Sequence, residues 1–218
     1  DLLLKKYSST IFKLISHGKY DIIEYGFIKF KNNLNKNKFM HLYPFRGSQL
    51  TKKIGIDLYL NTVWYASIRI FKKKLWKKIK FPNLYYEDVA TIHKVYDRSK
   101  SVFFIDKPFL GYRENQNSIT SNISIKNYND MMTVFLSINT NNKIHKKILK
   151  IRVARSICYF KNFLKIRDKN YIKIKESIEK IEIPISVLFK LKIPDLLYFK
   201  FNLIYEFVDK MRFLLKSK

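Results

Sequence analysis

Two adjacent carboxylates, Glu87 and Asp88, are the side chains of this 218-residue chain best placed for acid–base chemistry. They follow an aromatic loop in the segment FPNLYYEDVATIHKVY, residues 81–96, where a helical spacing of apolar residues begins. Acidic residues are common in the first turn of a helix because the helix dipole stabilises negative charge there. A carboxylate held rigidly at such a position can also take a proton from a hydroxyl group as a general base. The pair therefore has two interpretations, a helix cap and a catalytic group.

A second group of polar residues lies in GYRENQNSIT, residues 111–120. Arg113, Ser118 and Thr120 offer one guanidinium and two hydroxyl groups, which are suited to binding phosphate oxygens. The alternative is a surface loop that contains one arginine. The sequence predicts no zinc site, because Cys158 is the only cysteine and no two histidines are four residues apart.

Three aromatic residues near these groups, Trp64, Tyr85 and Tyr86, are candidates for contacts with a ligand. Trp64 has a second interpretation, as a core residue of a helix expected over residues 57–79 with a break or a strand near residues 63–71. One face of that helix would contain Leu60, Trp64, Ile68 and Phe71.

The composition indicates an anionic partner. The formal net charge is +27, from 44 Lys and Arg against 17 Asp and Glu, which favours nucleic acid, a phosphate-rich ligand or an acidic membrane surface. Only eight of the basic residues are Arg, whereas specific base readers favour Arg, and no RNA- or DNA-binding motif is present. We therefore expect no specific nucleic-acid partner. The single cysteine is typical of a reducing compartment such as the cytoplasm.

The apolar pattern predicts an α/β fold, with a mixed sheet flanked by helices in residues 1–125 and an α-helical extension in residues 126–218. Residues 20–30 indicate a strand that is apolar on both faces, as in a buried strand. The segment 101–113 predicts a strand, a proline-containing turn and a second extended piece. Helices are expected over residues 2–17 and 87–100.

The lysine-rich extension has two interpretations. One is a set of packed helices with solvated lysine faces, and the other is a basic amphipathic surface that binds anionic lipid head groups. In the second case the apolar contact would come from Leu188, Phe189, Leu191, Leu196, Phe199, Phe201 and Ile204.

In their order, these segments resemble the acceptor half of bacterial family 2 glycosyltransferases, which have the GT-A fold. The series is a Trp-containing segment (VWYASIRIFKKKLW), Phe-Pro followed by Tyr-Glu-Asp-Val, a strand (SVFFIDKPF), and Tyr-Arg followed by Ser-Ile-Thr. A Glu-Asp pair alone is a weak signal, but the ordered set over residues 57–121 is much more specific.

The resemblance implies an inverting transfer of a sugar from a nucleotide-sugar donor to a surface-polysaccharide or lipid-linked glycan acceptor. It implies that Asp88 is the general base and that Glu87 beside it shapes the acceptor site, together with the three aromatic residues named above. Arg113, Ser118 and Thr120 would contact the donor diphosphate. Such an acceptor implies a peripheral protein on the inner face of the cytoplasmic membrane, with its anionic surface as a partner.

Members of this family begin with a nucleotide-binding half that ends in an Asp-x-Asp motif for a divalent metal, Mg²⁺ or Mn²⁺. The present sequence resembles only the part of those enzymes after that half, so Asp1 is expected to be the last residue of the motif or the next one. The other metal ligands are then expected outside this sequence. Two alternatives to an active enzyme stay open: a non-catalytic basic module that binds membranes or nucleic acid, and an inactive glycosyltransferase remnant.

Overall fold

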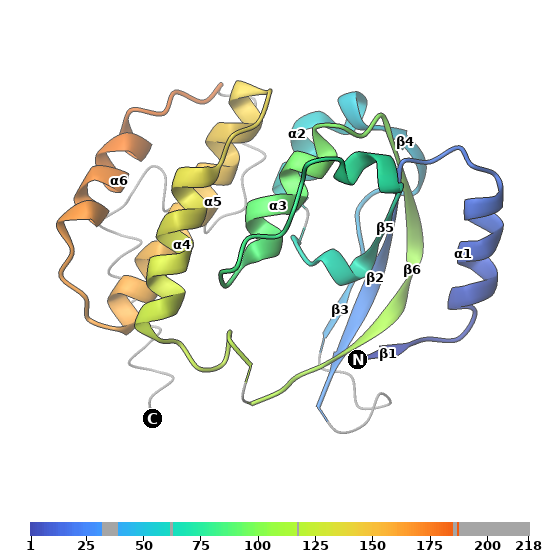
Figure 1. Cartoon of the computed structure of the whole chain (residues 1–218), viewed down its shortest axis with the longest axis horizontal. Coiled ribbons are helices and arrows are strands. Elements are labelled where there is room, and N and C mark those ends of the chain that lie inside the picture. The colour runs from blue at the N-terminus through green and yellow to red at the C-terminus, as the bar shows by residue number, and fades with distance from the viewer. Residues whose placement is uncertain (32–38, 62, 117, 185–186, 188–218) are drawn as a thin grey trace. The chain divides into compact units, whose positions relative to one another are not determined.

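The computed structural model describes residues 1–31, 39–61, 63–116, 118–184 and 187, which form a mixed α/β protein (Figure 1). The chain divides into two compact units. The first contains Asp1–Pro82 and Thr91–Ser121, and the second contains Asn83–Ala90 and Asn122–Lys218.

The first unit is built on one mixed sheet, which has six strands in the described residues. The strands are β1 (Leu2–Leu3), β2 (Ile22–Phe30), β3 (Phe39–His41), β4 (Gly47–Leu50), β5 (Arg69–Phe71) and β6 (Ser101–Arg113). The two long strands, β2 and β6, run parallel to each other, and the other pairings are antiparallel. β2 also pairs with β3 and β5, while β6 also pairs with β1 and β4. The expected mixed sheet flanked by helices is confirmed.

The helical elements of this unit are short. They are α1 (Tyr7–Ser16), α2 (Thr51–Asn61), the last six residues of α3 (Glu87–Tyr96), and 3-10 helices at Ala66–Ile68 and Lys73–Trp76.

Strand β2 confirms the buried strand expected over residues 20–30, because its first six residues are all buried. Gly26 is required at its centre, since a Cβ atom there would lie 2.3 Å from the carbonyl oxygen of His41. The register with β6 shifts at the same place: Tyr25 pairs with Ile105, and Gly26 pairs with Pro108. Two residues of β6 are thus left over in a bulge.

Three sequence-based expectations about these elements are wrong in part. The turn expected within residues 101–113 is the bulge of a continuous strand, β6. The helix expected over residues 57–79 ends at Asn61, and 3-10 turns replace its later part. The strand expected as an alternative near residues 63–71 is confirmed by β5, whose long-range pairing with β2 outweighs the local helical pattern. The helix expected over residues 2–17 is restricted to α1, since Leu2 and Leu3 pair with β6 instead.

The second unit is helical. It contains α4 (Ile125–Ser137), α5 (Lys143–Phe163), α6 (Lys169–Glu179) and the first four residues of α3. Side chains cap all three of the helices α4 to α6: Asn127 accepts a hydrogen bond from the amide of Ser124, Asn142 accepts from the amides of Ile144 and His145, and Asp168 accepts one from the amide of Asn170. The helices expected after residue 126 are confirmed as far as the structure describes them.

The seven apolar residues proposed for lipid contact, from Leu188 to Ile204, lie outside the described residues. In the described part of the chain, no helix combines the length and the hydrophobicity needed to cross a membrane.

Candidate functional site

The Glu87–Asp88 pair opens helix α3, in the second unit. Both side chains are half-buried, and the amide of Val89 donates a hydrogen bond of 2.9 Å to Oδ1 of Asp88. The partial positive charge of the helix start favours carboxylates at these two positions. The expected helix start at the acidic pair is therefore confirmed, and it places two carboxylates in one turn.

The two tyrosines before this pair are tied to α4 and α5 of the same unit. The amide of Tyr85 donates a 2.7 Å hydrogen bond to Oδ2 of Asp130, and Lys126 Nζ lies 4.6 Å from the centre of the Tyr85 ring. The Tyr86 hydroxyl accepts a 2.8 Å hydrogen bond from Asn127, and its ring stacks on Phe160 with 5.7 Å between centroids. These contacts fix the loop that leads into Glu87 and Asp88.

The backbone and the phenol of Tyr86 are both constrained. Its φ of 63° lies in the left-handed region, which is uncommon for a residue other than glycine. Burial raises the pKa of its phenol, although the hydrogen bond from Asn127 opposes this. Tyr86 is thus held in one conformation directly before the acidic pair.

A pocket of about 670 Å³ lies in the first unit, beyond the ends of β2 and β6. Its size is typical of small-molecule sites. Two lysines from the end of β2, Lys29 and Lys31, bring positive charge to it, and Lys29 Nζ lies 5.8 Å from the centre of the Tyr112 ring. The lining residues are Lys29, Lys31, Tyr112, Glu114, Asn115, Gln116, Ser118, Thr120 and Ser121.

The hydroxyl groups in this pocket form one connected turn. Ser118 Oγ lies 3.2 Å from Thr120 Oγ1 and 2.7 Å from Ser121 Oγ, and Ser121 Oγ donates a 3.1 Å hydrogen bond to the carbonyl of Asn115. Hydroxyl groups beside ammonium groups can bind phosphate oxygens. Among the residues chosen from the sequence, Ser118 and Thr120 are therefore brought together in a basic pocket.

Arg113 and Asp1 also meet in the first unit. The amide of Arg113 donates a 3.1 Å hydrogen bond to Oδ1 of Asp1, and its exposed guanidinium lies 5.5 Å from the centre of the Phe30 ring. Its neighbours Tyr112 and Glu114 line the pocket.

The described residues do not by themselves form a metal centre. The carboxylate of Asp1 is engaged by a backbone amide, and no cluster of three His, Cys, Asp or Glu side chains suitable for a metal ion occurs in the described ranges. A Mg²⁺ or Mn²⁺ ion needs several oxygen ligands. Asp1 and its described neighbours alone thus do not supply a complete set of ligands, and a metal site completed from outside this sequence stays a prediction.

Trp64 lies in the core of the first unit, with 7% of its surface exposed. Its ring contacts those of Tyr59 and Tyr96, at centroid distances of 5.6 Å and 6.3 Å. The side chain therefore packs against α2 and α3, and it presents little surface to a ligand.

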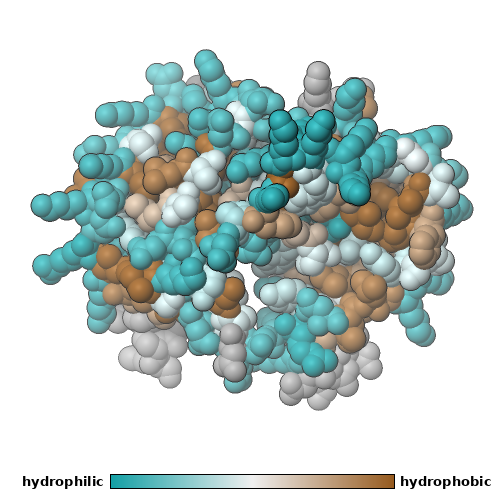
Figure 2. Space-filling view, viewed as in Figure 1, coloured by the Kyte–Doolittle hydropathy of each residue, from teal (hydrophilic) through white to brown (hydrophobic). Residues whose placement is uncertain are grey.

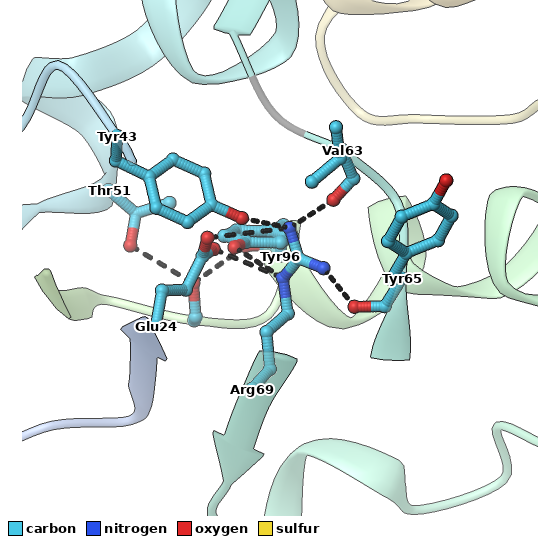
Figure 3. A network of polar contacts seen from close by, with 8 residues as sticks. Glu24, Tyr43, Thr51, Val63, Tyr65, Arg69 and Tyr96 are labelled. Atoms are coloured by element: carbon cyan, nitrogen blue, oxygen red, sulfur yellow. Dashed lines mark hydrogen bonds and ion pairs between the residues drawn. The ribbon is translucent and has the colours of Figure 1, made fainter. Parts of the chain in front are cut away.

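A buried ion pair near Trp64 is the centre of a network of polar contacts (Figure 3). Glu24 of β2 and Arg69 of β5 are directly opposite each other in the sheet, and both side chains are 0% exposed. Arg69 Nε lies 3.2 Å from Glu24 Oε1, and Nη2 donates to Oε2 at 3.4 Å. Burial raises the pKa of Glu24, although the guanidinium opposes this.

Arg69 has further partners from several segments. It donates to the hydroxyls of Tyr96 and Tyr43 at 3.0 Å and 3.1 Å, to the carbonyl of Val63 at 2.6 Å, and to the carbonyl of Tyr65. The Tyr65 ring in turn stacks on Tyr112, which lines the basic pocket, with 5.8 Å between centroids. The guanidinium therefore fixes the loop that supports one wall of the pocket.

Sequence reasoning missed Lys29, Lys31 and the Glu24–Arg69 pair. A signal for each exists in the sequence. Lys29 and Lys31 are two residues apart, so they lie on one face at the end of the predicted strand. Glu24 is a charged residue among apolar neighbours at the centre of the predicted strand, away from Asp21 and Lys29 near its ends, which indicates a buried partner.

The nine residues selected from the sequence fall into two groups. Tyr85, Tyr86, Glu87 and Asp88 belong to the second unit, and Asp1, Trp64, Arg113, Ser118 and Thr120 belong to the first. A comparison with known protein families finds no family that matches the chain, and a comparison with curated proteins finds no matching sequence.

Proposed function

We propose that this chain carries the acceptor side of an inverting family 2 glycosyltransferase with the GT-A fold. The enzyme would transfer a sugar from a nucleotide-sugar donor to a surface-polysaccharide or lipid-linked glycan at the inner face of the cytoplasmic membrane. The observation that carries the proposal is the acidic pair in the first turn of α3, behind an aromatic loop that α4 and α5 hold in place.

In the proposed reaction, Asp88 takes the proton of an acceptor hydroxyl while that oxygen attacks the anomeric carbon. The bond from the anomeric carbon to the nucleoside diphosphate breaks, and the diphosphate leaves with the bonding electrons. Inversion results because attack and departure occur on opposite faces of the sugar. A positioned general base contributes about 10²–10⁴ in rate.

The basic pocket supports a role in binding the leaving diphosphate. Lys29 and Lys31 supply positive charge, while Ser118 and Thr120 supply hydroxyl groups. Positive groups that are already in place stabilise charge that develops on a leaving group. Arg113 does not line the pocket, but its guanidinium is exposed over the Phe30 ring and would join the lysines when a diphosphate is bound.

The direct test is turnover of nucleotide sugars by the full-length gene product that contains this chain. Asp88→Asn is expected to lower turnover by about a hundredfold or more, because amide nitrogen and oxygen cannot take the proton. Glu87→Gln is expected to lower it less. Glu179→Gln, which changes an exposed carboxylate at the end of α6, is the control and should have no effect.

Thermal unfolding of each variant shows whether the fold is intact. If Asp88→Asn folds and turns over donor at the normal rate, the acidic pair is a helix cap and the proposal fails. If the parent protein turns over no nucleotide sugar, the non-catalytic alternatives gain support.

A further inference from the structure

A groove among α4, α5 and α6 is unused by the proposed reaction. Its volume is about 570 Å³, which is within the range of ligand sites. Apolar side chains from α4 and α6 form much of its wall, and polar groups are spread along it. The lining residues are Asn129, Met132, Thr133, Phe135, Leu136, Lys150, Asp168, Asn170, Lys173, Ile174 and Ser177.

Lys150 is the distinctive group of this groove. Its side chain is half-buried, and Nζ lies 4.8 Å from the centre of the Phe135 ring. Burial lowers the pKa of Lys150, and the nearby charge of Lys146 lowers it further. Within the described ranges Lys150 forms no ion pair. A desolvated ammonium is costly without an anionic partner, and the contact with an aromatic ring offsets only part of that cost.

The acidic residue in the groove already has partners of its own. Asp168 Oδ2 accepts a 2.9 Å hydrogen bond from the Tyr128 hydroxyl, and Oδ1 accepts a 2.7 Å hydrogen bond from the amide of Asn170. Its carboxylate caps α6. Asp168 is therefore engaged by these partners, and within the described ranges it forms no ion pair with Lys150.

The rim combines apolar surface with positive charge. Leu136 is 76% exposed although it is a large apolar residue, and the Lys173 side chain is exposed across the groove on α6. In the space-filling view, apolar patches lie among hydrophilic side chains over these helices, on the left (Figure 2). Such a surface is complementary to a molecule with an apolar chain and an anionic head.

We propose that this groove binds an anionic phospholipid, with an acyl chain against Met132 and Leu136 and the head-group phosphate at Lys150 and Lys173. A nucleic acid would match the lysines but not the apolar wall, and a neutral lipid would match the wall but not the lysines. The net charge of +27 favours approach to a negatively charged bilayer. The inference does not depend on the proposed glycosyl transfer.

The test is co-sedimentation of the full chain with phosphatidylcholine vesicles, with and without phosphatidylglycerol. Binding is expected only when phosphatidylglycerol is present. Lys150→Met is expected to weaken it roughly fivefold, the scale of one lysine close to an anionic surface. Lys143→Met removes the same charge from an exposed position in the first turn of α5, outside the groove, and should weaken binding much less.

A second matched pair tests the apolar contact. Leu136→Asp and Ile172→Asp each place one carboxylate on an exposed position, and only Leu136 lines the groove. Leu136→Asp is expected to reduce vesicle binding about tenfold, and Ile172→Asp far less. Because both side chains are exposed, neither change should prevent folding, which thermal unfolding would verify.

Several results would overturn the proposal. Equal losses within either matched pair would show that binding follows total charge and not the groove. Displacement from vesicles by glycerol phosphate, which has no acyl chain, would show that the site recognises a phosphate alone. Light scattering without added lipid tests whether the chain forms a dimer. A dimer that Leu136→Asp dissociates would show that a second copy of the chain occupies the groove.

Discussion

Two basic side chains, Arg69 in the first unit and Lys150 in the second, lie in contrasting environments. Arg69 is completely buried, and its guanidinium nitrogens face the Glu24 carboxylate, two tyrosine hydroxyls and two backbone carbonyls. Lys150 is half-buried against Phe135 in an open groove, and the described residues give it no ion pair.

The difference separates a structural charge from one that is available to a ligand. A guanidinium with a full set of acceptors is already stabilised, so it joins β2, β5 and α3 and gains nothing from an outside anion. An ammonium that lacks an anionic partner next to an apolar wall would be stabilised by binding one. Stability measurements can test this contrast without knowledge of any substrate.

The largest effect is expected for Arg69→Met. The substitution leaves Glu24 buried without a counter-ion and removes the donors for two tyrosines and two carbonyls, so the free energy of unfolding should fall by about 3–5 kcal/mol. Lys150→Met should change it by less than about 1 kcal/mol, or raise it, because no ion pair is lost. Urea unfolding followed by far-ultraviolet circular dichroism, to which the helices of both units contribute, measures both. Similar losses in the free energy of unfolding for the two variants would contradict the proposed difference between Arg69 and Lys150.

The next effect concerns the coupling between Glu24 and Arg69. Glu24→Leu alone should be strongly destabilising, since it leaves a buried guanidinium without its carboxylate. The double variant Glu24→Leu/Arg69→Met should cost less than the two single changes together, by roughly 0.5–3 kcal/mol. A double-mutant cycle in urea gives this value. Strict additivity would mean that the tyrosines and carbonyls, and not the ion pair, stabilise Arg69.

The contrast also shows what could be predicted from the sequence. Strand β2 and helix α3 are predicted by local patterns: an apolar run in one case, and an acidic pair before helical spacing in the other. Both elements could be predicted because their local sequence preference agrees with the tertiary contacts that they form. It was harder to predict from the sequence that Arg69 is the buried partner of Glu24, because the residues around Arg69 have a helical spacing of apolar side chains.

Long-range contacts decided the remaining features. Strand β5 is only three residues long, and it forms because Arg69 pairs across the sheet with Glu24, 45 positions earlier. The groove at Lys150 needs three helices in place before it exists. Neither the pairing nor the groove has a local signature, so the site residues near α3 could be proposed from motifs, while Arg69 as the partner of Glu24 and the role of Lys150 could not.

An uncharged network in the second unit should show a smaller effect than the ionic network of the first. Asn127 is 0% exposed; its Oδ1 accepts from the amide and hydroxyl of Ser124, both at 2.8 Å, and its Nδ2 donates to Tyr86. Asn127→Ala should lower the free energy of unfolding by about 1–3 kcal/mol, because it leaves buried polar groups unsatisfied. Tyr86→Phe removes only the last of these bonds and should cost less. Urea unfolding would contradict this if Asn127→Ala matched Arg69→Met.

The smallest effect is expected at Asp21, which lies just before β2 and close to Glu24 in sequence. Burial by itself raises the pKa of Asp21, but the 2.9 Å hydrogen bond from the amide of Lys100 and the ammonium groups of Lys74 and Lys72 together lower it. A lowered carboxyl pKa contributes stability above the unfolded value of about 3.9, and this contribution is lost as the pH falls through the folded value. The lysine side chains are 66% and 35% exposed, so solvent screening limits the contribution to about 1 kcal/mol.

Asp21→Asn should therefore lower stability at neutral pH by about that amount and make unfolding less sensitive to acid than in the parent chain. Thermal unfolding at neutral pH and at a pH below 4 measures the difference. Lys74→Met is the matched change, because it removes one ammonium and leaves the Lys100 hydrogen bond in place, and it should produce a smaller loss. If both variants lose the same stability at both pH values, the exposed lysines and not the buried carboxylate would account for the effect. The stabilisation around Asp21 would then come from exposed groups, and not from a buried interaction such as the Glu24–Arg69 pair.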